Sequence, residues 1–153
     1  MTTTQTSPFS NASKSTQSVE LRDVYAACRL HNNIQTLYRL LEERTPEQSI
    51  SHHGMPELLE HEAFVLNQPY MHWYLIDVGK NTVGAVYLSK QREIGLFIFD
   101  KYRGRGYGSL ALKAIMDKHP GRFLANIAPK NGKSHNFFKK HGFKPIQVTY
   151  ECV

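Results

Sequence analysis

Apolar side chains recur along this chain with two different spacings, and each spacing predicts one kind of secondary structure. Between positions 71 and 99 they form three runs that are typical of strands, "MHWYLIDV", "TVGAVYLS" and "EIGLFIF". A glycine turn, "GKN", separates the first two runs, and a short polar link separates the last two. Runs this close together pair as antiparallel neighbours. The pattern therefore predicts an antiparallel meander in the middle of the chain.

Helical spacing is typical of the region before the meander. Apolar residues recur every three or four positions from residue 34 to 41, which predicts a helix that Asn32 or Asn33 caps and that ends near Arg44. The segment "PELLEHEAFVLN", residues 56–67, predicts a second helix, whose apolar stripe is Leu58, Leu59, Phe64 and Val65. Alternation in "LRDVYAACRL", residues 21–30, predicts a first strand ahead of both helices.

After the meander, the pattern predicts helix, strand, helix and strand. A helix occupies about residues 109–118 and ends before "HPG", and "RFLANIA", residues 122–128, predicts a strand. "SHNFFKKHGF" predicts a short helix closed by Gly142, and "KPIQVTYEC", residues 144–152, a last strand. Residues 1–18 are rich in Thr, Ser and Gln, which predicts a disordered tail. We expect one domain over residues 19–153.

The composition is that of one ordinary globular domain. The chain has 153 residues, of which 41% are hydrophobic and 21% are charged, so it can bury a core of its own. No apolar run approaches the roughly 20 residues of a membrane span, and no segment is typical of a signal peptide. The sequence therefore predicts a cytoplasmic protein without a membrane partner.

Cysteine and histidine positions give no support to a disulfide framework or a metal site. Cys28 and Cys152 lie far apart and outside any CxxC spacing. We predict that both are free thiols, each packed in a strand. The histidines have no acidic or cysteine partners at recognised ligand spacing, so no metal is expected.

Positive charge gathers in the second half of the chain. The net charge is +6, and eleven of the nineteen Lys and Arg residues lie between Lys101 and Lys144. Charge concentrated around a glycine turn favours a local site for a polyanion, with a solvated basic surface as the alternative. A nucleic-acid-binding module would show aromatic residues interleaved with these charges and a recognised docking element. Neither is evident, so no nucleic-acid partner is expected.

The glycine-rich segment "RGRGYGS", residues 103–109, stands between a predicted strand and a predicted helix. Glycines let the backbone approach a ligand closely, and the first N–H groups of a helix have no intrahelical partner. Such a turn is typical of a phosphate site. A Walker A loop is excluded because no Lys-Ser or Lys-Thr follows, and the GxGxG spacing departs from the dinucleotide fingerprint. A simple strand-to-helix turn is the alternative.

The same segment resembles the acyl-CoA-binding signature of the GNAT superfamily of N-acetyltransferases, with Arg103, Gly106 and Gly108 at the defining positions. A second segment, "NGKSHNFFKKHGF", is similar to the family's closing segment, in which an Asn precedes the last helix and Gly-Phe follows it. The 22 residues from Ser109 to Lys130 leave room for one helix and one strand. The resemblance implies an α/β (α+β) fold, with a mixed, mostly antiparallel central sheet of six to seven strands flanked by about four helices.

This resemblance implies that acetyl-CoA is the co-substrate and assigns its site. The pyrophosphate would lie on the start of the helix, against Arg103, Gly104, Arg105, Gly106, Tyr107, Gly108 and Ser109. The pantetheine arm would lie along Leu96, Phe97 and Ile98, whose N–H groups would bind the thioester carbonyl and stabilise the oxyanion. Asn131 would contact the arm from its other side, and Phe138 would border the same site.

Two positions depart from the family's well-known branch that acts on ribosomal proteins. That branch has a tyrosine acid where this chain has Phe138, and a glutamate base where it has Asn126. Other branches place a glutamate near the start of the strand that ends in "LFIF", so Glu93 is the predicted general base. Strict alternation gives Glu93 the face of Phe97 and Phe99, and a solvated strand-edge glutamate is the alternative.

The first half of the chain loosely resembles GNATs that acetylate nucleotide-linked amino sugars, with Arg44, Ile50 and His61 at the matching positions. We therefore predict that Arg44 and His61 border the acceptor site. Branches that acetylate protein N-termini share this pattern, and an ordinary helix-surface histidine is a further alternative.

The expected activity is transfer of acetyl from acetyl-CoA to a primary amine by direct attack in a ternary complex. The preferred acceptor is a small molecule, with a nucleotide-linked amino sugar as the narrower candidate. The alternatives are a protein N-terminal or lysine acetyltransferase, and a non-catalytic module that binds acyl-CoA or nucleic acid. A homodimer is left open.

Overall fold

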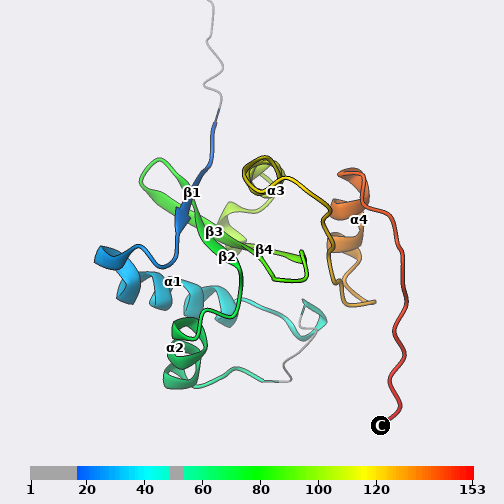
Figure 1. The fold of residues 1–153 in the computed structure, drawn as a ribbon, viewed down its shortest axis with the longest axis horizontal. Coiled ribbons are helices and arrows are strands. Elements are labelled where there is room, and N and C mark those ends of the chain that lie inside the picture. The colour runs from blue at the N-terminus through cyan, green and yellow to red at the C-terminus, as the bar shows by residue number, and fades with distance from the viewer. Residues whose placement is uncertain (1–16, 49–53) are drawn as a thin grey trace, which may run out of the picture.

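A four-stranded sheet organises the computed structural model, which describes residues 17–48 and 54–153 (Figure 1). Its strands are β1 (Glu20–Asp23), β2 (His72–Val78), β3 (Asn81–Leu88) and β4 (Ile94–Ile98). They lie in that order, and each pair of neighbours is antiparallel. The predicted meander is confirmed. Most of the predicted tail, together with Ile50, lies outside the described residues.

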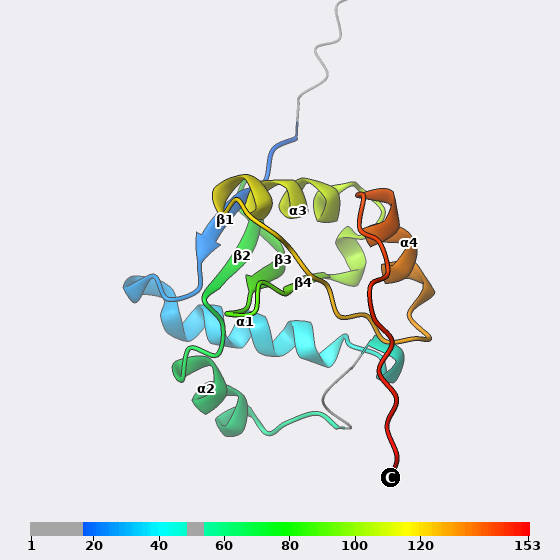
Figure 2. The ribbon, with the colours of Figure 1, turned by 45° about the vertical axis from the view of Figure 1, so that its right-hand side comes forward.

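Helices cover both faces of this sheet, which confirms the mixed α/β fold class. They are α1 (Leu30–Glu42), α2 (Leu58–Leu66), α3 (Tyr107–Lys118) and α4 (Gly132–Lys140). Figure 2 shows α1 and α2 on one side of the sheet and α3 on the other, with α4 beyond β4. Within the described ranges, no helix is both long and apolar enough to span a bilayer.

Alternation along β2 divides its side chains between two hydrophobic cores. Tyr74 and Ile76 face α3 and pack with its buried side chains Ala111, Leu112 and Ile115. Trp73 and Leu75 face the opposite way and pack with Ile34, Leu37 and Leu40 of α1. Burial on both faces gives the sheet a rigid position between helices. The strand edges and loops at β4 are therefore held on a fixed scaffold.

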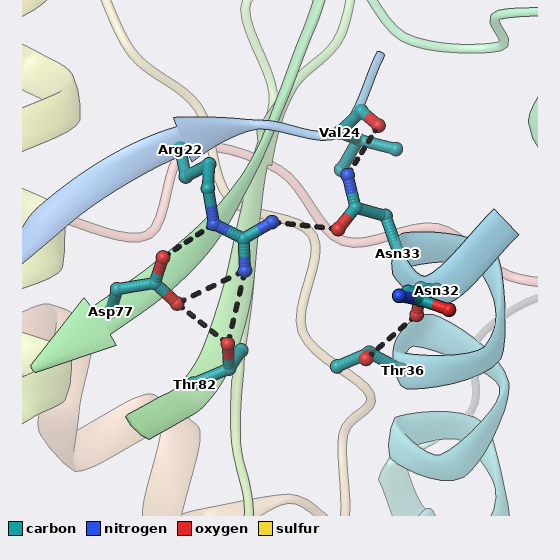
Figure 3. A network of polar contacts seen from close by, with 7 residues as sticks. All are labelled: Arg22, Val24, Asn32, Asn33, Thr36, Asp77 and Thr82. Carbon is teal, nitrogen blue, oxygen red and sulfur yellow. Dashed lines mark hydrogen bonds and ion pairs between the residues drawn. The ribbon is translucent and has the colours of Figure 1, made fainter. Parts of the chain in front are cut away.

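Arg22 joins the short strand β1 to the rest of the fold through a polar network (Figure 3). Its guanidinium pairs with Asp77 of β2, donates to Thr82 Oγ1 of β3 and donates to Asn33 Oδ1 of α1 at 2.6 Å. Asn33 is only 2% exposed, and its Nδ2 donates to the Val24 carbonyl oxygen at 2.8 Å. One buried asparagine therefore links α1 to the end of β1.

Replacing Asn33 with Ala should lower the free energy of unfolding by about 2 kcal/mol, because the Val24 carbonyl and the Arg22 guanidinium would each lose a partner where water has little access. Urea unfolding at neutral pH measures this change. Asn32→Ala is the matched control, since Asn32 has an exposed side chain on the same helix turn and only its backbone carbonyl accepts a bond, from Thr36. Equal stability of the two variants would contradict the assigned role of the network.

The strand count differs from the expected six to seven. Residues 122–128 form no ladder and contribute a single parallel bridge, between Glu93 and Leu124. Residues 144–152 are extended without a strand partner in the described structure, and Ile146, Val148 and Tyr150 are 68%, 75% and 91% exposed. An alternating pattern predicts extended backbone, but a strand also needs a neighbouring edge to pair with.

Three local predictions are wrong. β1 ends at Asp23, whose carboxylate accepts the Tyr25 N–H at 2.8 Å in a turn, and residues 27–29 form a 3₁₀ helix that leads into α1. Cys28 therefore lies in that turn and not in a strand, Cys152 lies outside any strand, and both thiols are free and exposed. Neither Asn32 nor Asn33 caps α1, because the helix already begins at Leu30.

The predicted apolar stripe of α2 is also wrong for most of its members. The buried side chains of this helix are His61 and Val65, whereas Leu58, Leu59 and Phe64 are 44%, 78% and 40% exposed. The helix begins after Glu57, which forms a capping box with Glu60. Val65 thus joins the core that packs on α1, whereas most of the helix's other apolar side chains are exposed.

Candidate functional site

The glycine segment connects β4 to α3 and leaves the start of α3 without a side-chain cap. Gly104 and Gly106 have φ angles of +73° and +85°, in the left-handed region that favours glycine. Gly106 occupies the N-cap position, and the first turn of α3 contains no acidic residue. The first amides of α3 and the positive end of its dipole are therefore available to an anion.

Two arginines border this helix start. Arg103 is held in place, because its Nε donates to the Ile98 carbonyl oxygen at 3.0 Å and its Nη1 pairs with Asp100 at 2.9 Å. Arg105 donates to the Lys101 carbonyl oxygen at 3.1 Å. Both side chains are exposed beside the glycines. The loop thus combines backbone donors with positive charge, the combination that phosphate binding requires.

The outer edge of β4 is open beyond its first residue. Ile94 donates to the Leu124 carbonyl oxygen at 2.8 Å, away from β3, whereas Phe99 donates to Val83 of β3 at 2.9 Å. Amides alternate in direction along an antiparallel strand, so the N–H groups of Leu96 and Ile98 point to the outer edge and that of Phe97 points to β3. The Glu93–Leu124 bridge is the one contact of this kind that the described residues 122–128 make. Among the residues that the structure describes, the N–H groups of Leu96 and Ile98 therefore have no strand partner and point to the space beyond.

A cavity of about 750 Å³ occupies this space, between the β4 edge, the glycine segment and α4. All of the sequence-predicted coenzyme residues except Arg105 line it: Leu96, Phe97, Ile98, Arg103, Gly104, Gly106, Tyr107, Gly108, Ser109, Asn131 and Phe138. Asn126 lines it as well. Asn131 also caps α4, because its Oδ1 accepts the Ser134 N–H at 3.1 Å. The glycine segment and the closing segment thus border one cavity, which we call the coenzyme cavity after the ligand that the sequence analysis predicts for these residues.

A second cavity, of about 960 Å³, lies between α1, α2 and the face of the sheet that these helices cover. Both sequence-predicted acceptor residues, Arg44 and His61, line it. Five aromatic side chains form part of its walls: Phe64, Tyr70, Trp73, Tyr87 and Phe97. The exposed apolar residue Phe64 of α2 therefore lines a cavity, which accounts for part of that helix's unusual exposure. We call this space the acceptor cavity, after the role that the sequence analysis predicts for Arg44 and His61.

His61 lies at the inner wall of the acceptor cavity. It is 3% exposed, its Nε2 lies 3.3 Å from the Ile34 carbonyl oxygen, and its ring lies 5.3 Å from that of Tyr38. Burial lowers the pKa of His61, although the bond to the Ile34 carbonyl opposes this effect. The buried ring is therefore held as the neutral imidazole, with its N–H donated to Ile34.

Because the pKa of His61 is lowered by folding, the unfolded chain binds this proton more readily, and stability should be lost as the pH falls below about 6.5. His61→Gln should weaken that loss. Urea unfolding at about pH 7.5 and pH 5.5 measures it, with the exposed His31→Gln as control. His119, whose pKa burial also lowers, contributes in the same direction and is present in all three proteins. An unchanged pH dependence in His61→Gln would contradict the assignment.

The two cavities meet at one place. Six residues line both of them: Arg44, Tyr70, Tyr87, Gly95, Leu96 and Phe97. The guanidinium of Arg44 lies 5.6 Å from the centre of the Phe97 ring, at this junction. A molecule in either cavity could therefore reach the same short stretch of β4.

Glu93 lines the coenzyme cavity next to this junction. The β3–β4 register runs without a shift, so no bulge turns the strand at this point. Ser89 lies opposite Glu93, donating its N–H to the Glu93 carbonyl oxygen at 2.9 Å and its hydroxyl to the carboxylate at 3.4 Å. The carboxylate thus stands at the start of β4, two residues before Gly95.

Sequence reasoning missed Tyr70, Tyr87 and Gly95. In the sequence, the tyrosines are ordinary aromatic residues in or near strands, and their convergence depends on tertiary structure. The available signal was Gly95, because glycine inside an apolar strand often marks a close approach by another group. In the described part of the chain, no group of three or more His, Cys, Asp or Glu side chains is arranged to hold a metal ion.

Comparisons with known proteins agree with this geometry. The family model described as "Acetyltransferase (GNAT) family" matches residues 34–143. A solved acetyltransferase from Thermus thermophilus is 20% identical, covers 85% of this chain and 89% of its own, and superposes with a TM-score of 0.68. No curated protein matched the chain in a sequence comparison.

Two further solved structures contain coenzyme A. A ribosomal L7/L12 alpha-N-protein acetyltransferase is 18% identical, with 80% of this chain and 78% of that chain covered and a TM-score of 0.63. An aminoglycoside N-acetyltransferase is 13% identical, with 90% and 95% covered and a TM-score of 0.64. At these identities the likeness shows a shared fold.

Proposed function

The chain belongs to the GNAT family of acetyltransferases, and we propose that it transfers the acetyl group of acetyl-CoA to a primary amine of a small molecule. Acetyl-CoA is the co-substrate in this family. The observation that carries the proposal is the junction of the coenzyme and acceptor cavities at Gly95, Leu96 and Phe97. Direct attack requires both substrates to reach one place at the same time, and this junction is such a place.

The coenzyme cavity supports this reaction through its backbone donors. The glycine segment and the start of α3 would bind the pyrophosphate, and the arm would extend along the β4 edge. The outward N–H of Leu96 would then hydrogen-bond the thioester carbonyl oxygen, and that bond would strengthen as the amine attacks and the oxygen becomes negative. Glu93 would accept the proton of the amine, directly or through one water molecule, because a protonated amine has no lone pair with which to attack.

The acceptor cavity supports a small molecule over a protein. Its volume of about 960 Å³ lies within the usual range of sites for small ligands, roughly 300–1,000 Å³. Walls from α1, α2 and the sheet surround it on several sides. Arg44 stands where the two cavities meet and could bind a phosphate or carboxylate of the acceptor. That position supports a nucleotide-linked amino sugar as the narrower candidate.

The test is release of free coenzyme A from acetyl-CoA in the presence of amino sugars, nucleotide-linked amino sugars, polyamines and peptides with free N-termini. We expect transfer to a small amine, with the acetylated product identified by mass spectrometry. Transfer to peptides alone would support the rival, a protein N-terminal acetyltransferase. Binding of coenzyme A without transfer to any amine would contradict the proposed activity and support the non-catalytic alternative.

A further inference from the structure

Tyr87 of β3 lies flat across β4 at the junction of the two cavities. The register pairs Tyr87 with Gly95, and a Cβ atom at Gly95 would overlap both the ring and the hydroxyl of Tyr87. The side chain therefore occupies space that only a glycine leaves free. Its hydroxyl ends against the residue that precedes Leu96, whose N–H points to the coenzyme cavity.

Neighbouring aromatic rings hold Tyr87 in this position. The ring of Tyr70 stacks on it, with centroids 3.7 Å apart and planes 3° from parallel. Trp73 in turn packs edge-on against Tyr70 at 4.8 Å. A stacked ring cannot swing away without losing these contacts, so the hydroxyl stays at the junction.

The family position that could supply a proton to the leaving thiolate is occupied by Phe138. This side chain is 8% exposed and packs between Phe137 and Phe143, and it has no proton to give. A phenolic hydroxyl can donate a hydrogen bond and a proton. Tyr70 and Tyr87 are the two tyrosines among the described residues that line both cavities. Of these, Tyr87 lies against the backbone of β4, so close that a Cβ atom at Gly95 would overlap its ring.

We propose that the Tyr87 hydroxyl is the acid that protonates the sulfur of coenzyme A as the thioester bond breaks. The proposal rests on the proposed function, because it assigns a step of that reaction. It makes Tyr87 a catalytic residue that contacts the reacting atoms. Gly95 and Tyr70 are positioning residues that hold its hydroxyl.

The reaction forms one bond to the acetyl carbon and breaks one. The amine nitrogen forms a bond to the acetyl carbon, and the carbonyl electron pair moves to the oxygen, where the Leu96 N–H stabilises it. When that pair returns, the carbon–sulfur bond breaks, its electrons go to sulfur, and sulfur takes the Tyr87 proton. Glu93 releases the first proton of the amine to water before the attack. After the attack, the nitrogen loses its second proton to Glu93, and that proton restores the Tyr87 hydroxyl. The products are the acetylated amine and the free thiol.

The register allows this return of the proton. Glu93 lies two residues before Gly95, the partner of Tyr87, and alternation gives it the same face of the sheet. Such diagonal neighbours have backbone positions roughly 7–8 Å apart, which long side chains can span, directly or through one water molecule. The two groups could therefore exchange a proton without leaving the sheet face.

The first test is steady-state kinetics of Tyr87→Phe, which keeps the ring and its stack and removes only the hydroxyl. We expect kcat to fall about 100-fold, at the lower end of what a positioned acid contributes, with little change in the KM for acetyl-CoA. Tyr74→Phe is the matched control, because its hydroxyl contacts His119 on the other face of the sheet, away from both cavities. Melting temperatures of all variants exclude loss of fold.

The second test does not require an acceptor. Coenzyme A bound to the enzyme is alkylated with iodoacetamide over a range of pH, and the modified coenzyme is counted by mass spectrometry. A hydrogen bond from Tyr87 stabilises the thiolate, so the pH midpoint of alkylation should be lower in the wild type than in Tyr87→Phe. A merely structural role for Tyr87 would leave this midpoint unchanged.

The outcomes separate the two proposals. If Tyr87→Phe keeps the kcat of the wild type, or if the two proteins share one pH midpoint of alkylation, the role of Tyr87 is overturned. The proposed function would still stand. If kcat falls in Tyr70→Phe but not in Tyr87→Phe, the Tyr70 hydroxyl donates the proton, and the proposed role of Tyr87 is overturned as well. A wild type that transfers to no amine but shows the shifted midpoint contradicts the proposed function and supports the contact between Tyr87 and sulfur.

Discussion

Gly106→Asp should reduce the affinity for coenzyme A by at least about 100-fold, which corresponds to roughly 3 kcal/mol. Gly106 has a φ of +85° and stands at the N-cap of α3, where the first amides have no side-chain partner. A carboxylate at this position would compete for the same amides and would repel the phosphates of the ligand. An aspartate would also be strained in the left-handed backbone, which adds to the loss.

Two measurements on the purified protein test this prediction. Calorimetry gives the dissociation constant directly, and thermal unfolding gives the stabilisation by bound ligand, about 2.7 kcal/mol when the ligand is present at a hundred times its dissociation constant. The wild type should show both signals in full, and Gly106→Asp should show much weaker binding and a correspondingly smaller stabilisation. Equal binding by the two proteins would mean that the phosphates do not lie on the start of α3.

Gly79→Asp is the matched control. Gly79 also has a positive φ, +59°, but it lies in the turn between β2 and β3, outside both cavity linings. The same substitution there introduces a similar backbone strain and the same charge. If Gly79→Asp lost coenzyme binding as well, the effect of Gly106→Asp would be one of general destabilisation.

Glu93→Gln should lower kcat by about 10² to 10⁴, the usual contribution of a general base, with much less effect on coenzyme binding. Glutamine keeps the length of the side chain and can still bond the Ser89 hydroxyl, but it cannot accept the proton of the amine. Kinetics at saturating substrates and calorimetry with coenzyme A together separate catalysis from binding.

Asp117→Asn is the control for removal of one carboxylate. Asp117 is exposed on α3 and pairs with Lys113 one turn away, so this change should leave kcat unaltered. A near-normal kcat in Glu93→Gln would move the base elsewhere. His61, which lines the acceptor cavity as a neutral imidazole, would then be the next residue to replace.

The local elements of this fold could be predicted from the sequence because their signals are local. The meander followed from three apolar runs separated by short turns, and the start of α3 followed from glycines whose positive φ angles no other residue adopts easily. Two linked motifs also indicated the family and most of the coenzyme cavity, since each motif is a contiguous segment that carries its own backbone geometry. Short-range spacing was sufficient for each of these.

Features that depend on what a segment packs against could not be predicted in this way. Residues 144–152 alternate like a strand, yet no described edge pairs with them, and most of the apolar stripe of α2 is exposed or faces a cavity. Asn33 looked like a helix cap because its type favours that position, but it is buried between Arg22 and Val24. In each case a partner distant in sequence determined the outcome.

The functional site shows the same distinction between local signals and features that depend on packing. The sequence by itself indicated a turn suited to phosphate, because the types and spacing of its glycines and arginines carry that chemistry. The role of Glu93 as a base came from the resemblance to the family and stays a prediction. Only the tertiary structure determined that Tyr87 lies over Gly95, because that contact requires β3 and β4 to pair in one particular register. It likewise brought Arg44 of the first half of the chain to Phe97 of β4. Whether two cavities meet depends on how the helices and strands pack, and no local sequence pattern predicts it.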